Sequence, residues 1–180
     1  NTTLTCTATG LSANATYSVR IKSFKKTTAT TYFSDYLTFS ADTRIPNVTS
    51  LTYKADSASQ ITLSWKRNAA ADGYTVEIYR GGKWEQVLCA TSNTILSCKI
   101  TGLAEGSTYS VRIKSYKVKN GRTVFSEYLK STATTGLNPV AKLGEQTSNT
   151  ASSIRFSWAR KSCATGYIVE IYKGGKWNLV

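Results

Sequence analysis

Few side chains in this 180-residue sequence are of the types that carry out catalysis. It contains no His, and its ten Asp and Glu residues are scattered along the chain. Glu77 and Glu170 occupy the same position in two copies of a sequence repeat. Their side chains are expected to point outward beside Arg112 on the neighbouring strand, where a cross-strand ion pair is expected. The sequence shows no metal-ligand cluster, no glycine-rich phosphate loop and no nucleophile with a neighbouring base. We therefore predict a protein that is not an enzyme and that uses no cofactor or metal.

Two of the four cysteines are spaced to form a structural disulfide. Cys89 and Cys98 flank eight residues that include Thr and Asn and that resemble a loop between two strands. This spacing favours a disulfide, which implies an oxidising, extracytoplasmic setting and contributes roughly 2.5 to 3 kcal/mol in the chain-entropy model. Cys6 corresponds to Cys98 by the repeat described below, and Cys163 corresponds to Ala70. The partners of Cys6 and Cys163 stay unassigned.

Aromatic and basic side chains are the candidates for binding. Trp84 and Trp177 each follow a Gly-Gly pair, where an indole ring is able to stack on a sugar or, alternatively, to pack across its own hairpin. Arg112 and Lys114 belong to a basic band, in keeping with a formal net charge of +13. The band is either a solvated face or a site for an anionic glycan or wall polymer. No motif for specific nucleic-acid binding accompanies it.

The sequence repeats with a period of 92 to 93 residues. Residues Tyr17–Ser23 return without a gap as Tyr109–Ser115, and much of Gly73–Tyr79 returns as Gly166–Tyr172. The first match lies in the second half of the repeat and the second match in its first half. We therefore predict three segments, namely the C-terminal half of a repeat at 1–43, a complete repeat at 44–136 and the N-terminal half of another at 137–180.

Strand patterns fill the complete repeat. Apolar and polar residues alternate with period 2, Thr, Val, Ile and Tyr are abundant, and only two Pro occur in the chain. Gly81-Gly82 and Asn120-Gly121 are two-residue hairpin signals. The expected strands run over residues 48–54, 60–66, 74–79, 83–88, 94–100 and 123–131. A further strand begins at residue 109 and is joined to the last one by the Asn120-Gly121 turn. Seven short antiparallel strands with frequent turns predict an all-β sandwich.

Several large side chains carry a family resemblance. A Trp in the second strand, a Tyr that opens the third, and a Leu six residues before another Tyr resemble a fibronectin type III domain. The resemblance implies tandem immunoglobulin-like sandwiches, and it implies that the Tyr109 hydroxyl bonds to backbone near Leu103. The implied core positions, which recur in both half repeats, are Trp65, Tyr74, Leu103, Tyr109, Trp158, Tyr167, Leu11 and Tyr17.

The two half repeats complement one another, and each alone would expose unpaired edges and an apolar face. Three arrangements would cover these edges and faces. The segment is a window onto a longer tandem array, or the end of one chain completes the beginning of the next by strand addition, or the two halves close within one chain. Self-association through the halves, or contact between neighbouring repeats, is the expected partnership.

The expected setting is extracellular or at a cell surface, and the Thr- and Lys-rich texture resembles repeats of secreted and surface proteins of bacteria. The absence of an initiator Met and a leader suggests a segment of a larger or processed product, and no apolar run is long enough for a membrane span. Asn1, Asn14 and Asn47 begin glycosylation sequons, which matter only in a eukaryotic secretory pathway. The sequence predicts a structural or adhesive stalk or filament. The alternative is an accessory polysaccharide- or wall-binding module of a secreted hydrolase.

Overall fold

Every regular element of the structure is a β-strand. The structure, a computed structural model, describes residues 4–90, 92–141, 144 and 148–180, so the sequon at Asn1 lies outside the described residues. The chain divides into two compact units, Asn1–Thr52 with Ser64–Cys98 and Val111–Ser131, and Tyr53–Leu63 with Lys99–Ser110 and Thr132–Val180. Over the described residues, no helix has the length and apolar character needed to cross a membrane.

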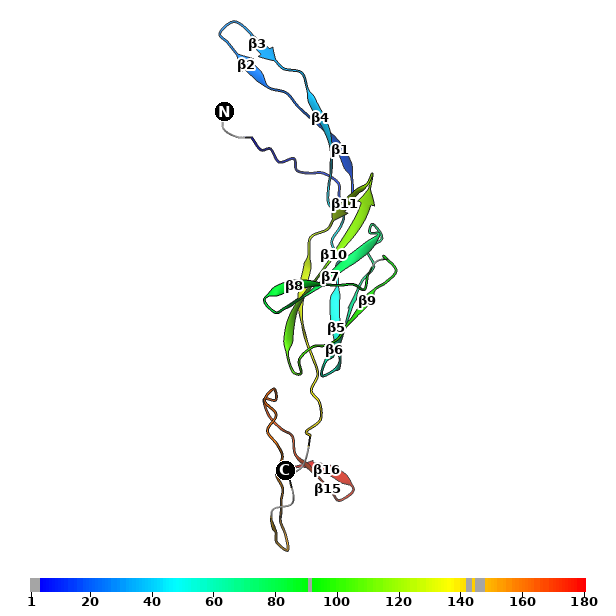
Figure 1. The fold of residues 1–180 in the computed structure, drawn as a ribbon, viewed down its shortest axis with the longest axis vertical. Helices are drawn as coiled ribbons and strands as arrows, with labels where there is room; N and C mark the ends of the chain where they lie inside the picture. The colour runs from blue at the N-terminus through cyan, green and yellow to red at the C-terminus, as the bar shows by residue number, and fades with distance from the viewer. Residues whose placement is uncertain (1–3, 91, 142–143, 145–147) are drawn as a thin grey trace. The chain divides into compact units, whose positions relative to one another are not determined.

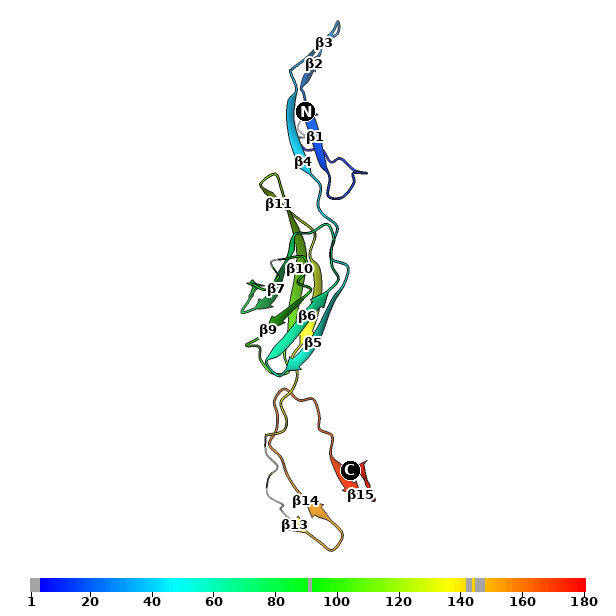
Figure 2. The same ribbon diagram turned by 90° about the vertical axis from the view of Figure 1, so that its right-hand side faces the viewer.

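The central repeat is a β-sandwich of two sheets (Figure 1; Figure 2). One sheet has three strands in the order β5-β6-β9, and the other has the order β11-β10-β7-β8, with β12 paired to β10. The strands are β5 (Leu51–Ser57), β6 (Gln60–Trp65), β7 (Gly73–Arg80), β8 (Lys83–Val87), β9 (Ser97–Ile100), β10 (Thr108–Lys119), β11 (Arg122–Phe125) and β12 (Leu129–Thr134). The predicted all-β, immunoglobulin-like architecture is thereby confirmed for this repeat.

Alternation along the strands places the core. In β6 the side chains at Ile61, Leu63 and Trp65 are buried while those between them are partly exposed. The same pattern holds in β7 at Val76 and Ile78. Because successive side chains of a strand point to opposite faces, one face of each sheet supplies the apolar core.

Two glycine-containing turns set the register of the larger sheet. Arg80 pairs with Lys83, and the two residues between them, Gly81 and Gly82, have φ values of 58° and 80°. At the other turn Asn120 and Gly121 have φ values of 48° and 76°. Positive φ at both central residues is the conformation that two-residue hairpins favour, so the two predicted hairpins are present.

The predicted strand over 123–131 is wrong as a single element. The structure has two strands there, β11 and β12, separated by residues 126–128. The break forms because buried Ser126 makes two hydrogen bonds to Ser115. The Ser126 N–H donates to the Ser115 carbonyl oxygen at 3.0 Å, and the Ser126 Oγ accepts from the Ser115 N–H at 3.0 Å. Since a side chain replaces a backbone partner, the strand is interrupted here, and pairing with β10 resumes in β12.

The N-terminal segment contains two hairpins. β1 (Thr16–Ile21) pairs antiparallel with β4 (Leu37–Asp42), and β2 (Phe24–Lys26) pairs with β3 (Thr31–Phe33). Each hairpin is a two-stranded sheet by itself. Two-stranded ribbons bury little surface, and every residue of β2 and β4 is at least partly exposed.

The C-terminal segment also consists of two-stranded ribbons. β13 (Ser148–Asn149) pairs with β14 (Ile154–Arg155), and β15 (Glu170–Lys173) pairs with β16 (Lys176–Leu179). Gly174 and Gly175, with φ values of 62° and 77°, form the second of these turns as Gly81 and Gly82 do in the central repeat. The hairpin of β15 and β16 therefore forms from its own local sequence.

Candidate functional site

Tyrosine hydroxyls fix the loops of all three segments in the same way. The N–H of Ala104 donates to the Tyr109 hydroxyl at 2.8 Å, and the N–H of Ser12 donates to that of Tyr17 at 2.9 Å. In the other half of the repeat the N–H of Asn68 donates to Tyr74 at 2.8 Å. The equivalent N–H of Lys161 donates to Tyr167 at 2.6 Å. Each flanking segment thus repeats a hydroxyl contact of the central repeat.

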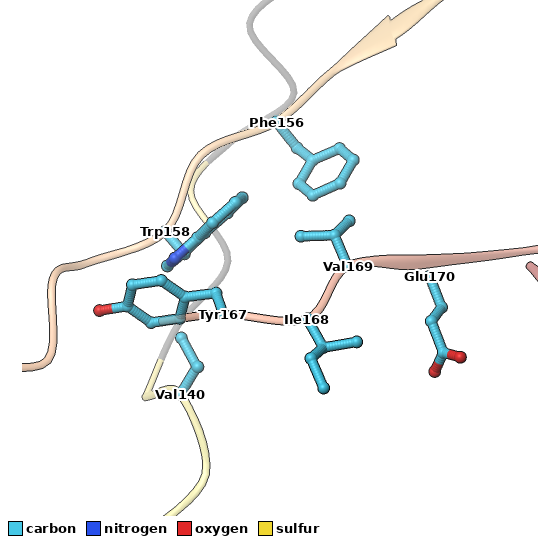
Figure 3. A pocket seen from close by; sticks show the side chains of 7 residues that line it. All are labelled: Val140, Phe156, Trp158, Tyr167, Ile168, Val169 and Glu170. Carbon is cyan, nitrogen blue, oxygen red and sulfur yellow. The ribbon is translucent and has the colours of Figure 1, made fainter. Parts of the chain in front are cut away.

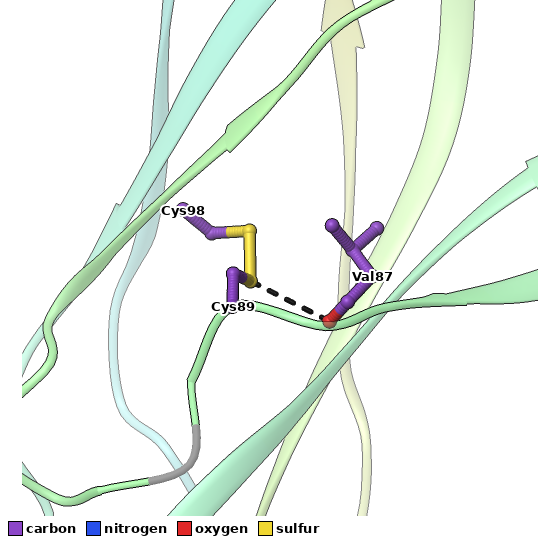
Figure 4. Close-up of a disulfide and its surroundings, with 3 residues drawn as sticks. All are labelled: Val87, Cys89 and Cys98. Atoms are coloured by element: carbon purple, nitrogen blue, oxygen red, sulfur yellow. Dashed lines mark hydrogen bonds between the residues drawn. A yellow bond between two sulfur atoms is a disulfide. The ribbon is translucent and has the colours of Figure 1, made fainter.

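A disulfide joins Cys89 and Cys98 beside strand β8, with their Cα atoms 5.6 Å apart (Figure 4). The Sγ of Cys89 also lies 3.5 Å from the carbonyl oxygen of Val87. Cys6 and Cys163 are free thiols. The bond ties the end of β8 to β9, and it indicates an environment in which disulfides persist.

Cations and aromatic rings alternate across the outer face of the five-stranded sheet. Arg112 lies 4.1 Å from the ring centroid of Trp84 and 4.1 Å from that of Tyr128. Lys114 lies 4.6 Å from the centroid of Tyr128 and 4.1 Å from that of Phe125. These five side chains, Trp84, Arg112, Tyr128, Lys114 and Phe125, are called the ladder below. Cations at these distances from ring faces are attracted by the ring quadrupole.

Glu77 anchors the ladder from strand β7. It pairs in register with Arg112, and the two side chains form an ion pair in which both are largely shielded from solvent. The Tyr128 hydroxyl donates to the other carboxylate oxygen of Glu77 at 2.8 Å. Trp84 contacts Tyr79 edge-on, with centroids 5.3 Å apart. A partly shielded charge pair that is also hydrogen-bonded is stronger than an exposed one, so the ladder is a structural element of the sheet.

Each flanking segment holds part of the same ladder. In the N-terminal segment Arg20 lies 4.3 Å from the centroid of Tyr36, and Lys22 lies 4.1 Å from that of Phe33 and 4.6 Å from that of Tyr36. Among the described residues Arg20 has neither an ion-pair partner nor a Trp ring.

In the C-terminal segment Trp177 stacks edge-on with Tyr172 at 5.4 Å, as Trp84 does with Tyr79. Trp177 is 65 % exposed, and Glu170 is exposed without an ion pair in the described part of the chain. The two flanking segments therefore hold opposite parts of the ladder.

One heptapeptide adopts a strand in two different environments. In the central repeat Val111 and Ile113 are 1 % and 0 % exposed. The identical residues Val19 and Ile21 of the N-terminal segment are 38 % and 61 % exposed. Because the local sequence is the same, the difference arises from the missing opposite layer, and an apolar face is left open to solvent.

The C-terminal segment shows the converse face. Side chains that form the core in the central repeat line an open cavity of about 300 Å³ here (Figure 3). Phe156, Trp158, Tyr167 and Val169 line it, at positions equivalent to buried Leu63, Trp65, Tyr74 and Val76. Trp158 and Tyr167 keep the edge-on contact of the central pair, at 5.4 Å and 64° in both. The cavity is thus a largely apolar surface that is open to solvent.

The structure sorts the predicted site residues into three groups. Trp84, Arg112 and Lys114 come together in the ladder, with their faces engaged by other side chains of the protein. Trp65, Tyr74 and Leu103 are buried, and Tyr109 is partly buried. Leu11, Tyr17, Trp158, Tyr167 and Trp177 lie in the flanking segments and retain at least partial exposure.

Sequence reasoning missed the rings of the ladder, Tyr128 and Phe125, and their equivalents Tyr36 and Phe33. The signal that would have found them is an aromatic residue recurring at matched positions in the last strands of both repeats.

Residues 46–132 match the family model of the fibronectin type III domain. The sandwich that these residues form has the fold of a fibronectin type III domain. Such domains are typically structural modules without catalytic activity. The two flanking segments lie outside the matched residues.

Similar solved structures carry the same kind of domain. A two-domain fibronectin type III segment of chicken tenascin is 22 % identical, with 70 % of this chain and 68 % of that one covered, at a TM-score of 0.49. The fibronectin type III domain of the human collagen alpha-1(XX) chain is 13 % identical over 57 % of this chain and 97 % of its own, with a TM-score of 0.46. That of human contactin 1 is 13 % identical over 54 % and 82 %, with a TM-score of 0.40. No curated protein matches the chain.

Proposed function

We propose that this protein is an extracellular structural or adhesive element in which fibronectin type III repeats stand in tandem as a stalk or head-to-tail filament. The observation that carries the proposal is the exposure of core positions in both flanking segments. Val19 and Ile21 are open in one segment, and the cavity at Trp158 and Tyr167 is open in the other. Each open face corresponds to one half of the core that the central repeat closes.

Apolar burial drives the association in this proposal. Residues 1–43 contain four Lys and Arg against two Asp, and residues 137–180 contain six against two Glu, so both halves carry net positive charge. Net repulsion must therefore be outweighed by the apolar surface removed from water, at about 25 cal/mol per Å². Added salt screens the repulsion, and the association is expected to persist or strengthen as ionic strength rises.

The Cys89–Cys98 disulfide supports the extracellular assignment, because such bonds persist in oxidising compartments. Tandem fibronectin type III repeats joined by short linkers suit a load-bearing or spacing role, since each unit carries its own core.

Sedimentation velocity over a wide range of protein concentration tests the proposal. The intact chain is expected to form species larger than its 19.7 kDa mass, increasingly so at high concentration. Ile21→Ser removes apolar surface from the open face and should reduce association, whereas Lys26→Ser, an exposed change in the neighbouring hairpin, should not. A chain that stays monomeric at every concentration would contradict completion of the halves.

An accessory polysaccharide- or wall-binding module is the second candidate, because Trp177 presents an indole ring that is 65 % exposed. Pull-down on insoluble polysaccharide and wall polymer separates the two functions. Saturable binding that Trp177→Ala or Trp84→Ala abolishes would favour the binding module over a spacer.

A further inference from the structure

We infer that a second copy of this chain completes the ladder, with residues 137–180 of one copy seated on residues 1–43 of the next, and that Glu170 and Arg20 set the register of the joint. The inference rests on the proposed function and names the side chains that recognise one another. It follows from comparing what each flanking segment contains with what the central repeat requires.

The central repeat defines the complete set of contacts. Arg112 contacts three side chains there. They are the carboxylate of Glu77 on strand β7, the indole of Trp84 on strand β8 and the phenol ring of Tyr128, which follows β11. Among these contacts, the described residues of the N-terminal segment give Arg20 only the phenol ring of Tyr36. In the C-terminal segment Glu170 and Trp177 stand on β15 and β16 in the positions of Glu77 and Trp84. Bringing the segments together supplies each missing partner once.

A glycine gives an independent reason for the same pairing. At Gly73 an added Cβ would lie 2.6 Å from the hydroxyl oxygen of Tyr116 and 2.7 Å from its ring, so this ring lies directly over the glycine and would have to move to admit a side chain. At the equivalent Gly166 an added Cβ would meet nothing within 4 Å. The residue equivalent to Tyr116 is Phe24, which is 66 % exposed in the N-terminal segment. In the joint Phe24 covers Gly166, and the open space above this glycine is filled.

Charge reversal in two separate chains provides the decisive experiment. Arg20→Glu and Glu170→Arg each place like charges in the joint of a homogeneous sample, and each should weaken self-association about ten-fold or more by sedimentation velocity. An equimolar mixture of the two variants should restore association to within about two-fold of the unmodified chain, because every joint in an alternating assembly pairs opposite charges. Lys26→Glu is the matched control for charge change outside the ladder, and it should not weaken association, because it lowers the net repulsion between the halves.

The possible outcomes distinguish failure of the ladder joint from failure of the proposed function. Failure of the unmodified chain to associate would overturn both. Association of the unmodified chain without rescue in the mixture would overturn the ladder joint and leave completion of the halves standing. If the double variant Arg20→Glu/Glu170→Arg behaved as the unmodified chain while the mixture did not, the halves would close within one chain and the second copy would be refuted.

Gly166→Val provides a second measurement that does not involve charge. In a single copy an added Cβ at this position meets nothing within 4 Å, so the unfolding transition of the central repeat should be unchanged. In the joint it would collide with the Phe24 ring, and self-association should fall about ten-fold or more. Unaltered association of this variant would overturn the proposed seating of Phe24.

Discussion

At the scale of single residues, the chain repeats a hydroxyl contact whose surroundings differ between copies. Tyr109 and Tyr17 both accept a hydrogen bond from the backbone five residues earlier, at 2.8 and 2.9 Å. Only the first belongs to a complete sandwich, in which Leu103 is 6 % exposed, whereas the equivalent Leu11 is 43 % exposed. The same hydrogen bond thus restrains a loop over a buried core in the central repeat and a loop beside an exposed two-stranded ribbon in the N-terminal segment.

Replacing Tyr109 by Phe should lower the free energy of unfolding of the central repeat by about 1 kcal/mol. The change removes the acceptor of the Ala104 N–H and leaves that donor unpaired, while the ring keeps its packing. Urea unfolding monitored by circular dichroism measures the effect. Tyr17→Phe is the matched control and should leave this transition in place, so an equal loss in both variants would count against the distinction drawn here.

Residue-level prediction from the sequence depends on local patterns. The period of β6 and β7 places Trp65 and Tyr74 on the same face as their apolar neighbours, and the exposed fractions of these two side chains are 5 % and 3 %. Arg112 and Lys114 appeared only as a basic band, because the rings that they contact come from other strands. Sequence alternation shows the face on which a side chain lies but does not show its neighbours across the sheet.

At the scale of elements, the hairpin of β7 and β8 is held by an exposed ion pair near its turn. Arg80 Nε donates to Glu85 Oε2 at 2.5 Å, and Lys83 lies 3.7 Å from the other oxygen. The hydrogen bond from Arg80 holds the pKa of the Glu85 carboxyl below its ordinary value of 4.5, against the opposing effect of desolvation. The folded state therefore favours the ionised carboxylate.

Acidification should weaken this hairpin in a predictable direction. Because the folded pKa of Glu85 lies below the unfolded value of 4.5, its contribution is fully present above pH 4.5 and is lost as the pH falls through the folded pKa. Urea midpoints measured from pH 7 to pH 3 should fall less steeply for Glu85→Gln than for the unmodified chain. Identical slopes would show that the pair does not contribute, and salt should reduce the difference because the pair is exposed.

Most element boundaries follow from the sequence because turns with positive φ and alternating residues are local signals. The strand expected at 123–131 is divided in the structure. The division depends on Ser115 and Ser126, whose backbone and hydroxyl groups bond to one another. A contact between residues eleven apart in the chain, made by one hydroxyl, leaves no periodic trace in the sequence.

At the scale of the whole molecule, stability is distributed unevenly among the three segments. The central repeat has a buried core, whereas the flanking ribbons expose Phe24, Phe33, Ile168 and Leu179 at 59 % or more. Segments with little buried apolar surface open at little cost in free energy. Association that covers these faces would therefore raise the stability of the ends more than that of the middle.

Limited trypsin digestion should reveal this distribution. At low protein concentration we expect early cleavage at Lys25, Lys26, Lys173 and Lys176, which lie in exposed ribbons, and survival of a fragment close to residues 44–136. At high concentration the end segments should become protected. Mass spectrometry of the fragments identifies the sites. Equal cleavage of ends and centre at low concentration would contradict the difference in stability.

The heptapeptide shared by β1 and β10 allows amide exchange to be compared between two identical sequences in one molecule. Thr16 and Thr108 precede the two copies, so eight residues in a row are chemically identical and have matching intrinsic exchange rates. The ratio of the rates at Val111 and Val19, or at Ile113 and Ile21, reports the opening free energy of one environment relative to the other without any model peptide. In a growing assembly, the two copies would converge toward a single rate.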